Sequence, residues 1–175
     1  MAVDESVLKE IQSDGAVKTK KMTIIAWSGD LDKAWPTLIL ATTAAASGMD
    51  VTVFFTFWGL RILQRNDKRV TGRNWKQKAL SLMNRGGTDH LALSKLQMGG
   101  AGALMMKQLA TQHKVASPSE LLQIAQELGV TLLPCQMSLD LMGLKKEDLI
   151  DGLPDTVGAA TALQHMADAD IQLFI

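Results

Sequence analysis

The predicted fold rests first on the stretch Met22-Thr-Ile-Ile-Ala-Trp-Ser-Gly-Asp30. Its apolar, β-branched run before a Ser-Gly-Asp turn is typical of a buried strand that leads into a helix. The helical segment runs to about Ser47 and stops at Gly48. Asp50-Val-Thr-Val-Phe-Phe-Thr-Phe57 follows as a second strand, apolar on both faces as in a parallel sheet covered by helices. This order predicts a right-handed βαβ unit.

The same alternation returns in the last third of the chain. Ser117-Pro-Ser-Glu120 predicts a capped helix over 119–128, and the run 130–134 predicts a third strand. Ser138 can cap a short helix to about Met142, and Asp155 or Thr156 a last helix to about Ala167, before a closing strand at 169–175. The sequence therefore predicts an α/β fold: a three-layer α/β/α sandwich with a mostly parallel sheet of four to five strands.

Composition bounds the function classes. The 175 residues are 47% hydrophobic, which suits one packed domain rather than a disordered chain. Eighteen basic residues balance eighteen acidic ones, so we expect no nucleic-acid partner. The single cysteine excludes an intramolecular disulfide and fits a reducing compartment. We expect a cytoplasmic protein, with an N-terminal extension at 1–19, where 4–12 can form a short helix, and a single α/β domain at 20–175.

Residues 59–116 interrupt the rhythm of strands and helices. Five basic residues lie within 61–73, and they would either attract an anion or acidic partner or form a solvated face. Helices are expected at 75–83 and 104–113, separated by glycine clusters. We predict a flexible segment of the kind that serves as a lid, a partner-docking element or an oligomer contact. The short uncharged run 96–106, with its methionines, can contact a partner or the surface of a membrane.

Cys135 is the strongest candidate for chemistry. It comes directly after the third strand and before a helix start, and sites form at this edge of open α/β sheets. Helix N-terminal N–H groups there would favour a thiolate or persulfide. The alternative is a buried cysteine that acts as a small hydrophobic residue.

Other chemistry-bearing residues have simpler alternatives. His165 can pair with Cys135 if the last helix packs beside its strand. A solvated surface position is nevertheless expected for His165, as for His90 and His113. Asp30 and Asp32 can bind a cation but are expected to cap the first helix. Three tryptophans can wall a pocket near the strand ends or simply pack, namely Trp27, Trp58 and Trp75.

The sequence around Cys135 resembles that of a known protein family. Gly129-Val-Thr-Leu-Leu-Pro-Cys135-Gln-Met-Ser138-Leu-Asp-Leu-Met-Gly143 resembles the cysteine motif of the DsrE/DsrF-like sulfur-relay proteins, in the branch with a long Met- and Gly-rich segment before the cysteine. Further stretches agree in the expected order over residues 20–175: Ser28-Gly-Asp-Leu-Asp-Lys-Ala34, Phe54-Phe-Thr-Phe-Trp-Gly59, Lys95-Leu-Gln-Met-Gly-Gly100, Glu147-Asp-Leu-Ile-Asp-Gly152 and Gly158-Ala-Ala-Thr161.

This resemblance implies a sulfur carrier or sulfurtransferase that forms homo-oligomers. Cys135 would hold sulfur as a persulfide or thiosulfonate, and partners would be TusA-type carriers and rhodanese-like proteins. The Gln136–Ser138 backbone and the Ser138 hydroxyl would stabilise the terminal sulfur, while Gly158 and Ala159 would let the last helix approach. No cofactor or metal ion is implied. The alternative function is a non-catalytic oligomeric scaffold or regulatory binding module with an inert Cys135.

Overall fold

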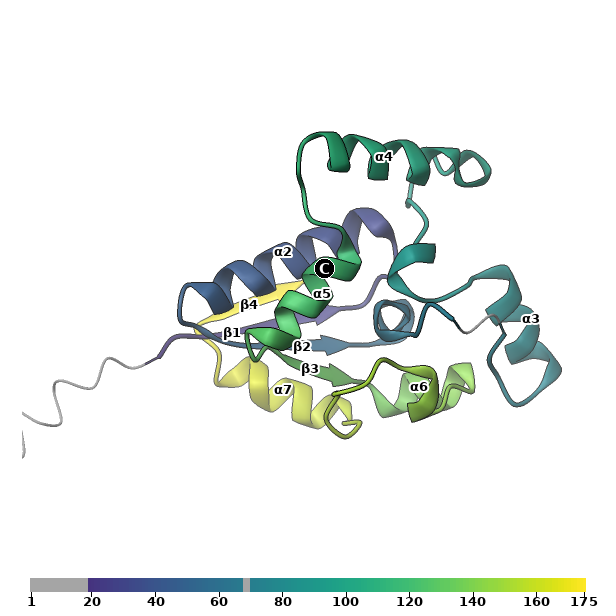
Figure 1. Cartoon of the computed structure of the whole chain (residues 1–175). Helices are drawn as coiled ribbons and strands as arrows, with labels where there is room; N and C mark the ends of the chain where they lie inside the picture. The colour runs from purple at the N-terminus through teal and green to yellow at the C-terminus, as the bar shows by residue number, and fades with distance from the viewer. Residues whose placement is uncertain (1–18, 68–69) are drawn as a thin grey trace, which may run out of the picture.

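The computed structural model describes residues 19–67 and 70–175 of the chain. Four parallel strands form its sheet: β1 (Lys21–Ala26), β2 (Asp50–Phe55), β3 (Thr131–Pro134) and β4 (Ile171–Phe174), in the order β3-β2-β1-β4 (Figure 1). The predicted parallel α/β sheet is confirmed. The predicted helix at 4–12 lies outside the described residues.

Helices cover both faces of the sheet (Figure 1). On one face, α2 (Leu31–Ala46) and α5 (Pro118–Glu127) bury the larger hydrophobic core against β1, β2 and β3. On the other face, α7 (Ala159–Ala167) covers a smaller core. The short helix α6 (Gln136–Met142) continues from the end of β3. The three layers match the predicted sandwich, because each strand of the sheet centre is apolar on both sides.

The caps of these helices differ in part from the predicted ones. The predicted cap of α5 is confirmed, and it is a full capping box, since Ser117 and Glu120 bond each other's backbone N–H groups. Ser138 lies inside α6 instead of capping it, and Cys135 takes the cap position. Gly158 takes the cap position of α7 in place of Asp155 or Thr156. Helix α6 begins earlier than predicted, because Cys135 at the end of the β2–β3 ladder already takes the cap position. Helix α7 begins later than predicted, because Val157 is still held in an extended bridge with Cys135.

The start of α2 shows how two predicted capping aspartates are used. Asp30 occupies the cap position, but its carboxylate accepts a hydrogen bond from the Ser28 hydroxyl rather than from a helix N–H. Asp32 lies in the first turn and accepts two hydrogen bonds from Ser94, at 2.8 Å from its N–H and 2.6 Å from its hydroxyl. Asp32 therefore ties α2 to the chain that leads into α4.

The segment 59–116 contains more structure than its composition suggested. It begins within the 3₁₀ helix η1 (Phe57–Leu63) and contains the helices α3 (Trp75–Met83) and α4 (Ala101–Gln112). It also contains the 3₁₀ turns η2 (Thr88–His90) and η3 (Met98–Gly100). Outside this segment, one more 3₁₀ turn, η4 (Lys146–Asp148), follows α6. Residues 59–63 are buried. The prediction of a basic face is wrong for Arg61, which is 5% exposed, while Arg65 pairs at the surface with Asp67 and Asp151.

Two further observations complete the fold. Val157 forms an isolated parallel bridge with Cys135, and the sheet of the described residues has four strands, within the predicted four to five. Among the helices of the described ranges, none combines the length and the apolar character needed to cross a bilayer.

Candidate functional site

Cys135 lies where β3 gives way to α6. Its N–H donates to the Phe55 carbonyl at 3.0 Å, which extends the β2–β3 ladder by one residue, and its own carbonyl accepts the Leu139 N–H of α6. The residue therefore belongs to the last step of the strand and to the cap of the helix at once. Cys135 therefore lies at the carboxyl edge of the sheet, as predicted.

The thiol of Cys135 lies under α7 and is 2% exposed. It belongs to the smaller core together with Ile25, Phe54, Leu133 and Ala162. Val157 packs against this group, and its backbone holds the cysteine from the side: the Gln136 N–H donates to the Val157 carbonyl, and the Val157 N–H to the Pro134 carbonyl, each at 3.0 Å. A reagent or partner can reach the sulfur only if this cover moves.

Ser138 fixes the first turn of α6 against the end of β2. Its hydroxyl oxygen accepts the Phe57 N–H at 2.8 Å and lies 3.2 Å from the Thr56 hydroxyl, and the residue is fully buried. Phe57 lies just beyond β2 with a positive φ of 49°, and its N–H is satisfied by Ser138 instead of by a neighbouring strand. Ser138 thus positions the loop beside Cys135, a role that the sequence did not indicate.

Gln136 closes the cover of Cys135 at the surface. Its side-chain oxygen accepts a hydrogen bond from the Thr156 hydroxyl, and its amide donates to Asp140 at 3.0 Å. Beyond Thr156, Lys146 bonds Asp155 at 2.8 Å, and this contact holds the pKa of Asp155 below its ordinary value. These contacts form a clasp, which we define as Gln136, Lys146, Asp155 and Thr156.

The backbone donors of α6 divide into bound and free groups. The resemblance implied that the Gln136 N–H would hold the terminal sulfur. In the structure this N–H is already bound to the Val157 carbonyl and is not available for that role. The N–H groups of Met137 and Ser138 find no acceptor within the described part of the chain, and no side chain caps this helix. These two donors remain for a negative charge on Cys135.

Gly158 and Ala159 lie at the exposed start of α7. A Cβ atom added at Gly158 would meet nothing within 4 Å, so the expected close approach of α7 at this glycine is not found. The small residue that does let α7 approach is Ala162, which is 4% exposed and packs in the core of Cys135. The spacing of Gly158 and Ala162 along one helix face was the available signal.

The register of the sheet separates His165 from Cys135. The His165 Nδ1 lies 3.5 Å from the Thr52 hydroxyl, and Thr52 pairs across the sheet with Thr131. Cys135 follows Thr131 by four residues, which is about 13 Å along a strand. The structure therefore does not form the Cys–His pair that the sequence allowed. His90 contacts the Asn66 carbonyl, and His113 is exposed at the end of α4.

Aromatic side chains lie along the carboxyl edge of the sheet, from the end of β2, which neighbours β3, to the end of β4 on the far side. Trp27 stacks on Phe174 with ring centroids 6.4 Å apart, and Phe57 meets the edge of Trp58 at 5.3 Å. Trp27, Phe57 and Phe174 are substantially exposed. The third predicted pocket residue, Trp75, lies on the outer side of α3 and is 75% exposed. The rim thus combines two predicted tryptophans with two phenylalanines that the sequence analysis did not single out.

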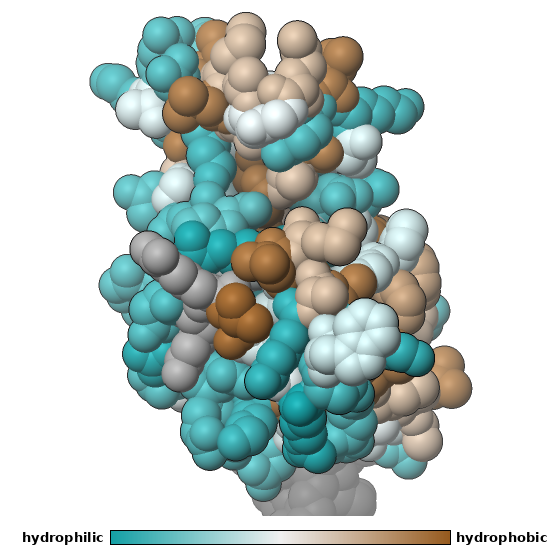
Figure 2. All heavy atoms as spheres, turned by 90° about the vertical axis from the view of Figure 1, so that its right-hand side faces the viewer, coloured by the Kyte–Doolittle hydropathy of each residue, from teal (hydrophilic) through white to brown (hydrophobic). Residues whose placement is uncertain are grey.

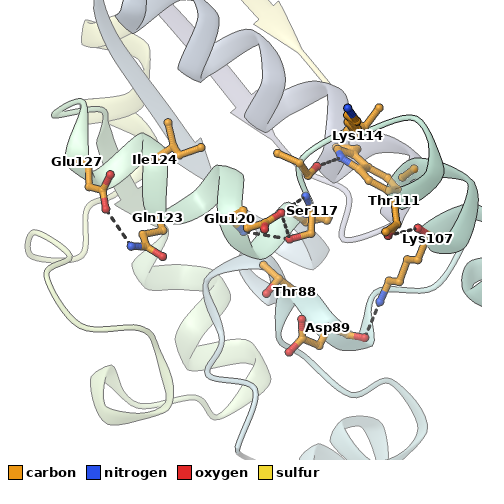
Figure 3. A pocket seen from close by; sticks show the side chains of 15 residues that line it. Thr88, Asp89, Lys107, Thr111, Lys114, Ser117, Glu120, Gln123, Ile124 and Glu127 are labelled. Carbon is orange, nitrogen blue, oxygen red and sulfur yellow. Dashed lines mark hydrogen bonds between the residues drawn. The ribbon is translucent and has the colours of Figure 1, made fainter.

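The described residues also form a groove, on the face of the sheet opposite to Cys135. It has a volume of about 650 Å³ and runs between α4 and α5, with Lys107 and Lys114 on one wall and Glu120 and Glu127 on the other (Figure 3). Because α5 packs on the α2 face and Cys135 lies under α7, this groove is not part of the cysteine site.

Helix α4, above that groove, leaves hydrophobic side chains uncovered. Figure 2 views the end of the molecule toward which the strands point, and hydrophobic side chains gather at its top, over α4. The exposed hydrophobic residues of α4 and of the turn before it are Leu96, Met98, Leu104, Met105, Met106 and Leu109. The methionines singled out from the sequence thus lie at the surface instead of filling the core.

Comparisons with known proteins agree with this geometry. The model of the DsrE/DsrF/DrsH-like family matches residues 18–174. The chain is 38% identical over 160 residues to the sulfur carrier protein DsrE2 of Allochromatium vinosum, covering 91% of this chain and all of that protein. It is 37% identical over 158 residues to the uncharacterized protein YrkE of Bacillus subtilis, covering 90% of this chain and 98% of YrkE.

A solved structure supports the fold. The crystal structure of the ychN protein from E. coli superimposes with a TM-score of 0.57 at 16% identity, over 90% of this chain and 100% of that one. At this identity the likeness concerns the fold alone. The family match and the two sequence relatives carry further: the chain belongs to the DsrE/DsrF/DrsH-like family.

Proposed function

We propose that this protein is a sulfur carrier that holds sulfane sulfur on Cys135 and passes it to a partner thiol. The observation that carries the proposal is the place of the cysteine: it joins the end of β3 to the first turn of α6, where two N–H groups lack acceptors among the described residues. Membership of the DsrE/DsrF/DrsH-like family and the likeness to a protein named as a sulfur carrier support the same function.

The chemistry is an exchange at sulfur. The Cys135 thiolate attacks the sulfane sulfur of a donor persulfide, a new S–S bond forms, and the donor leaves as a thiolate. With thiosulfate as donor, sulfite leaves instead, and the product on the protein is again a persulfide. Transfer onward reverses the roles, since the thiolate of the partner attacks the outer sulfur and Cys135 leaves as a thiolate. No electrons are gained or lost overall.

Access to the thiol requires the cover to open. Val157 is held by two backbone hydrogen bonds and by the clasp at the surface, so the segment 151–158 is the part whose release would expose Cys135. Release would leave β3 and α6 in place, because Ser138 anchors α6 to β2. In this proposal a partner docks against the aromatic rim and shifts that segment.

The partners follow from the family and remain part of the proposal. Donors and acceptors would be rhodanese-like proteins and TusA-type carriers, and the domain at 20–175 would act as a homo-oligomer in the cytoplasm. The exposed apolar side chains of 96–106 would serve a partner contact or a peripheral membrane contact.

Intact-protein mass spectrometry tests the proposal. Wild type and Cys135→Ser are exposed to polysulfide, thiosulfate or tetrathionate, and each is measured before and after a reductant. A reductant-reversible gain on wild type alone is expected, and its mass separates a persulfide from a thiosulfonate. Circular dichroism of Cys135→Ser confirms that the variant is folded. Equal loading of both proteins would refute a role for Cys135.

A second function is favoured by one observation, the burial of the thiol. With 2% exposure and apolar neighbours, Cys135 also fits a non-catalytic scaffold or regulatory binding module with an inert cysteine. Alkylation of the native protein distinguishes the two. An inert cysteine reacts only after unfolding, whereas a carrier must open often enough for the native thiol to react within the time of sulfur loading.

A further inference from the structure

Arg61 on η1 is a buried cation. The residue is 5% exposed, one terminal nitrogen of its guanidinium donates to the Arg85 carbonyl, and its Nε finds no acceptor in the described residues. Burying an unpaired charge costs far more than burying a neutral polar group. The position therefore calls for a negative partner.

The protein supplies little of that negative charge. Arg61 forms no ion pair with a carboxylate of the described ranges, and Asp30, the acid whose charge acts on it, is already engaged by the Ser28 hydroxyl and lies 3.9 Å from the Lys33 ammonium. Burial lowers the pKa of Arg61 to about 10, and the charge of Asp30 opposes this shift only in part. Arg61 thus stays protonated at neutral pH.

A small cavity opens beside this guanidinium, between η1, α3 and α6. It has a volume of about 20 Å³, room for roughly one water molecule. Trp58, Ser81, Asn84 and Met142 line it with Arg61. Arg61 is the charged member among the described lining residues, and none of them is acidic. The cavity is therefore electropositive.

Helix α3 forms the outer wall of this cavity and is loosely attached. None of its residues is buried, and Gln77 ties it to α6 by donating to the Asp140 and Leu141 carbonyls at 3.3 and 3.1 Å. A small movement of α3 would let an ion enter without disturbing the sheet.

We propose that this cavity binds one monovalent inorganic anion of about the size of a water molecule at Arg61. Chloride and hydrosulfide share this chemistry. That hydrosulfide is the occupant in the cell rests on the proposed sulfur-carrier function, but the anion site itself does not.

Chloride NMR line widths test the site on the full chain. Chloride is titrated at constant ionic strength against gluconate, and wild type is expected to broaden the line in a saturable way. Arg61→Met removes the charge and should abolish the broadening. Asn84→Leu fills the cavity while it keeps Arg61, and it should do the same. Arg73→Met, which removes an exposed arginine on the same segment, is the matched control and should bind as wild type does.

The outcomes decide the matter. Absence of saturable broadening in wild type, or its persistence in folded Asn84→Leu, overturns the proposal and leaves Arg61 as a structural donor to Arg85. If Arg61→Met does not fold, Asn84→Leu alone decides. Hydrosulfide is then added without oxygen to Cys135→Ser, which cannot load sulfur on the cysteine. Narrowing of the chloride line supports hydrosulfide as an occupant, and an unchanged line restricts the site to halide.

Discussion

The Ser138 hydroxyl accepts the Phe57 N–H across 2.8 Å and thereby ties the first turn of α6 to the end of β2. Phe57 follows the end of β2 and has a positive φ, and its N–H bonds Ser138 instead of a neighbouring strand. The two residues are 81 positions apart, so this contact exists only in the folded chain. It sets the place of α6, and with it the place of Cys135.

Ser138→Ala should therefore lower stability. The substitution removes the acceptor of the partly buried Phe57 N–H, which costs about 1 kcal/mol of the free energy of unfolding. Urea unfolding measures the loss. Ser119→Ala removes an exposed hydroxyl and should be within about 0.5 kcal/mol of wild type. Equal stability of the two variants would mean that water or another group serves the Phe57 N–H.

Gln136→Ala should speed the reaction of Cys135 with a thiol reagent. The change removes the contact with Thr156, so the segment over the thiol opens more often while the sheet stays intact. Alkylation of native protein, followed by mass spectrometry, measures the rate. Gln123→Ala is the matched control, because Gln123 also bonds an acidic residue one helical turn on but lies on α5. If both variants react as slowly as wild type, the clasp does not control access.

Stability should depend on pH through the contact between Asp32 and Ser94. Burial acts to raise the pKa of Asp32, but the hydrogen bonds from Ser94 and the charge of Lys33 outweigh it, so the pKa lies below its ordinary value of 3.8. A folded-state pKa below the unfolded one stabilises the fold above the unfolded pKa, and this contribution is lost as pH falls through the folded pKa.

Ser94→Ala measures this contribution. At neutral pH the variant should lose about 1 kcal/mol, a value discounted for the exposed position. The difference from wild type in thermal unfolding should shrink below the ordinary pKa of an aspartate. Ser47→Ala removes a comparable exposed bond to the Thr43 carbonyl, which does not titrate, so its effect should not change with pH. A constant difference for Ser94→Ala would contradict the assignment.

Gly59→Ala should destabilise the junction of β1 and η1. A Cβ atom at this position would collide with the Ala26 carbonyl oxygen, which is backbone and cannot move aside. We expect a loss of about 1–3 kcal/mol in the free energy of unfolding. Gly158→Ala provides the contrast, since its new Cβ enters open space and its φ of −89° suits any residue. Equal stability of both variants would show that the backbone at Gly59 relaxes.

Local sequence patterns were enough for the elements of the sheet. The apolar run of β2 and the turn after β1 carry their own signal, because burial on both faces requires continuous apolar residues. The capping box of Ser117 and Glu120 is equally local. The predicted cap of α7 failed because the bridge between Cys135 and Val157, a contact between distant residues, holds the chain extended beyond Thr156. The predicted cap of α6 failed because the helix starts directly after Cys135, before Ser138.

The candidate site divides in the same way. The order of strands and helices and the place of Cys135 after a strand could be predicted from local patterns, since strand length and alternation depend on neighbouring residues. Local patterns did not predict that the thiol lies under α7 or that Arg61 is buried. They also did not predict that Ser138 accepts the Phe57 N–H, or that His165 lies four residues along the sheet from Cys135. The physical reason is that register and burial depend on which distant segments pack together, and that choice belongs to the whole fold.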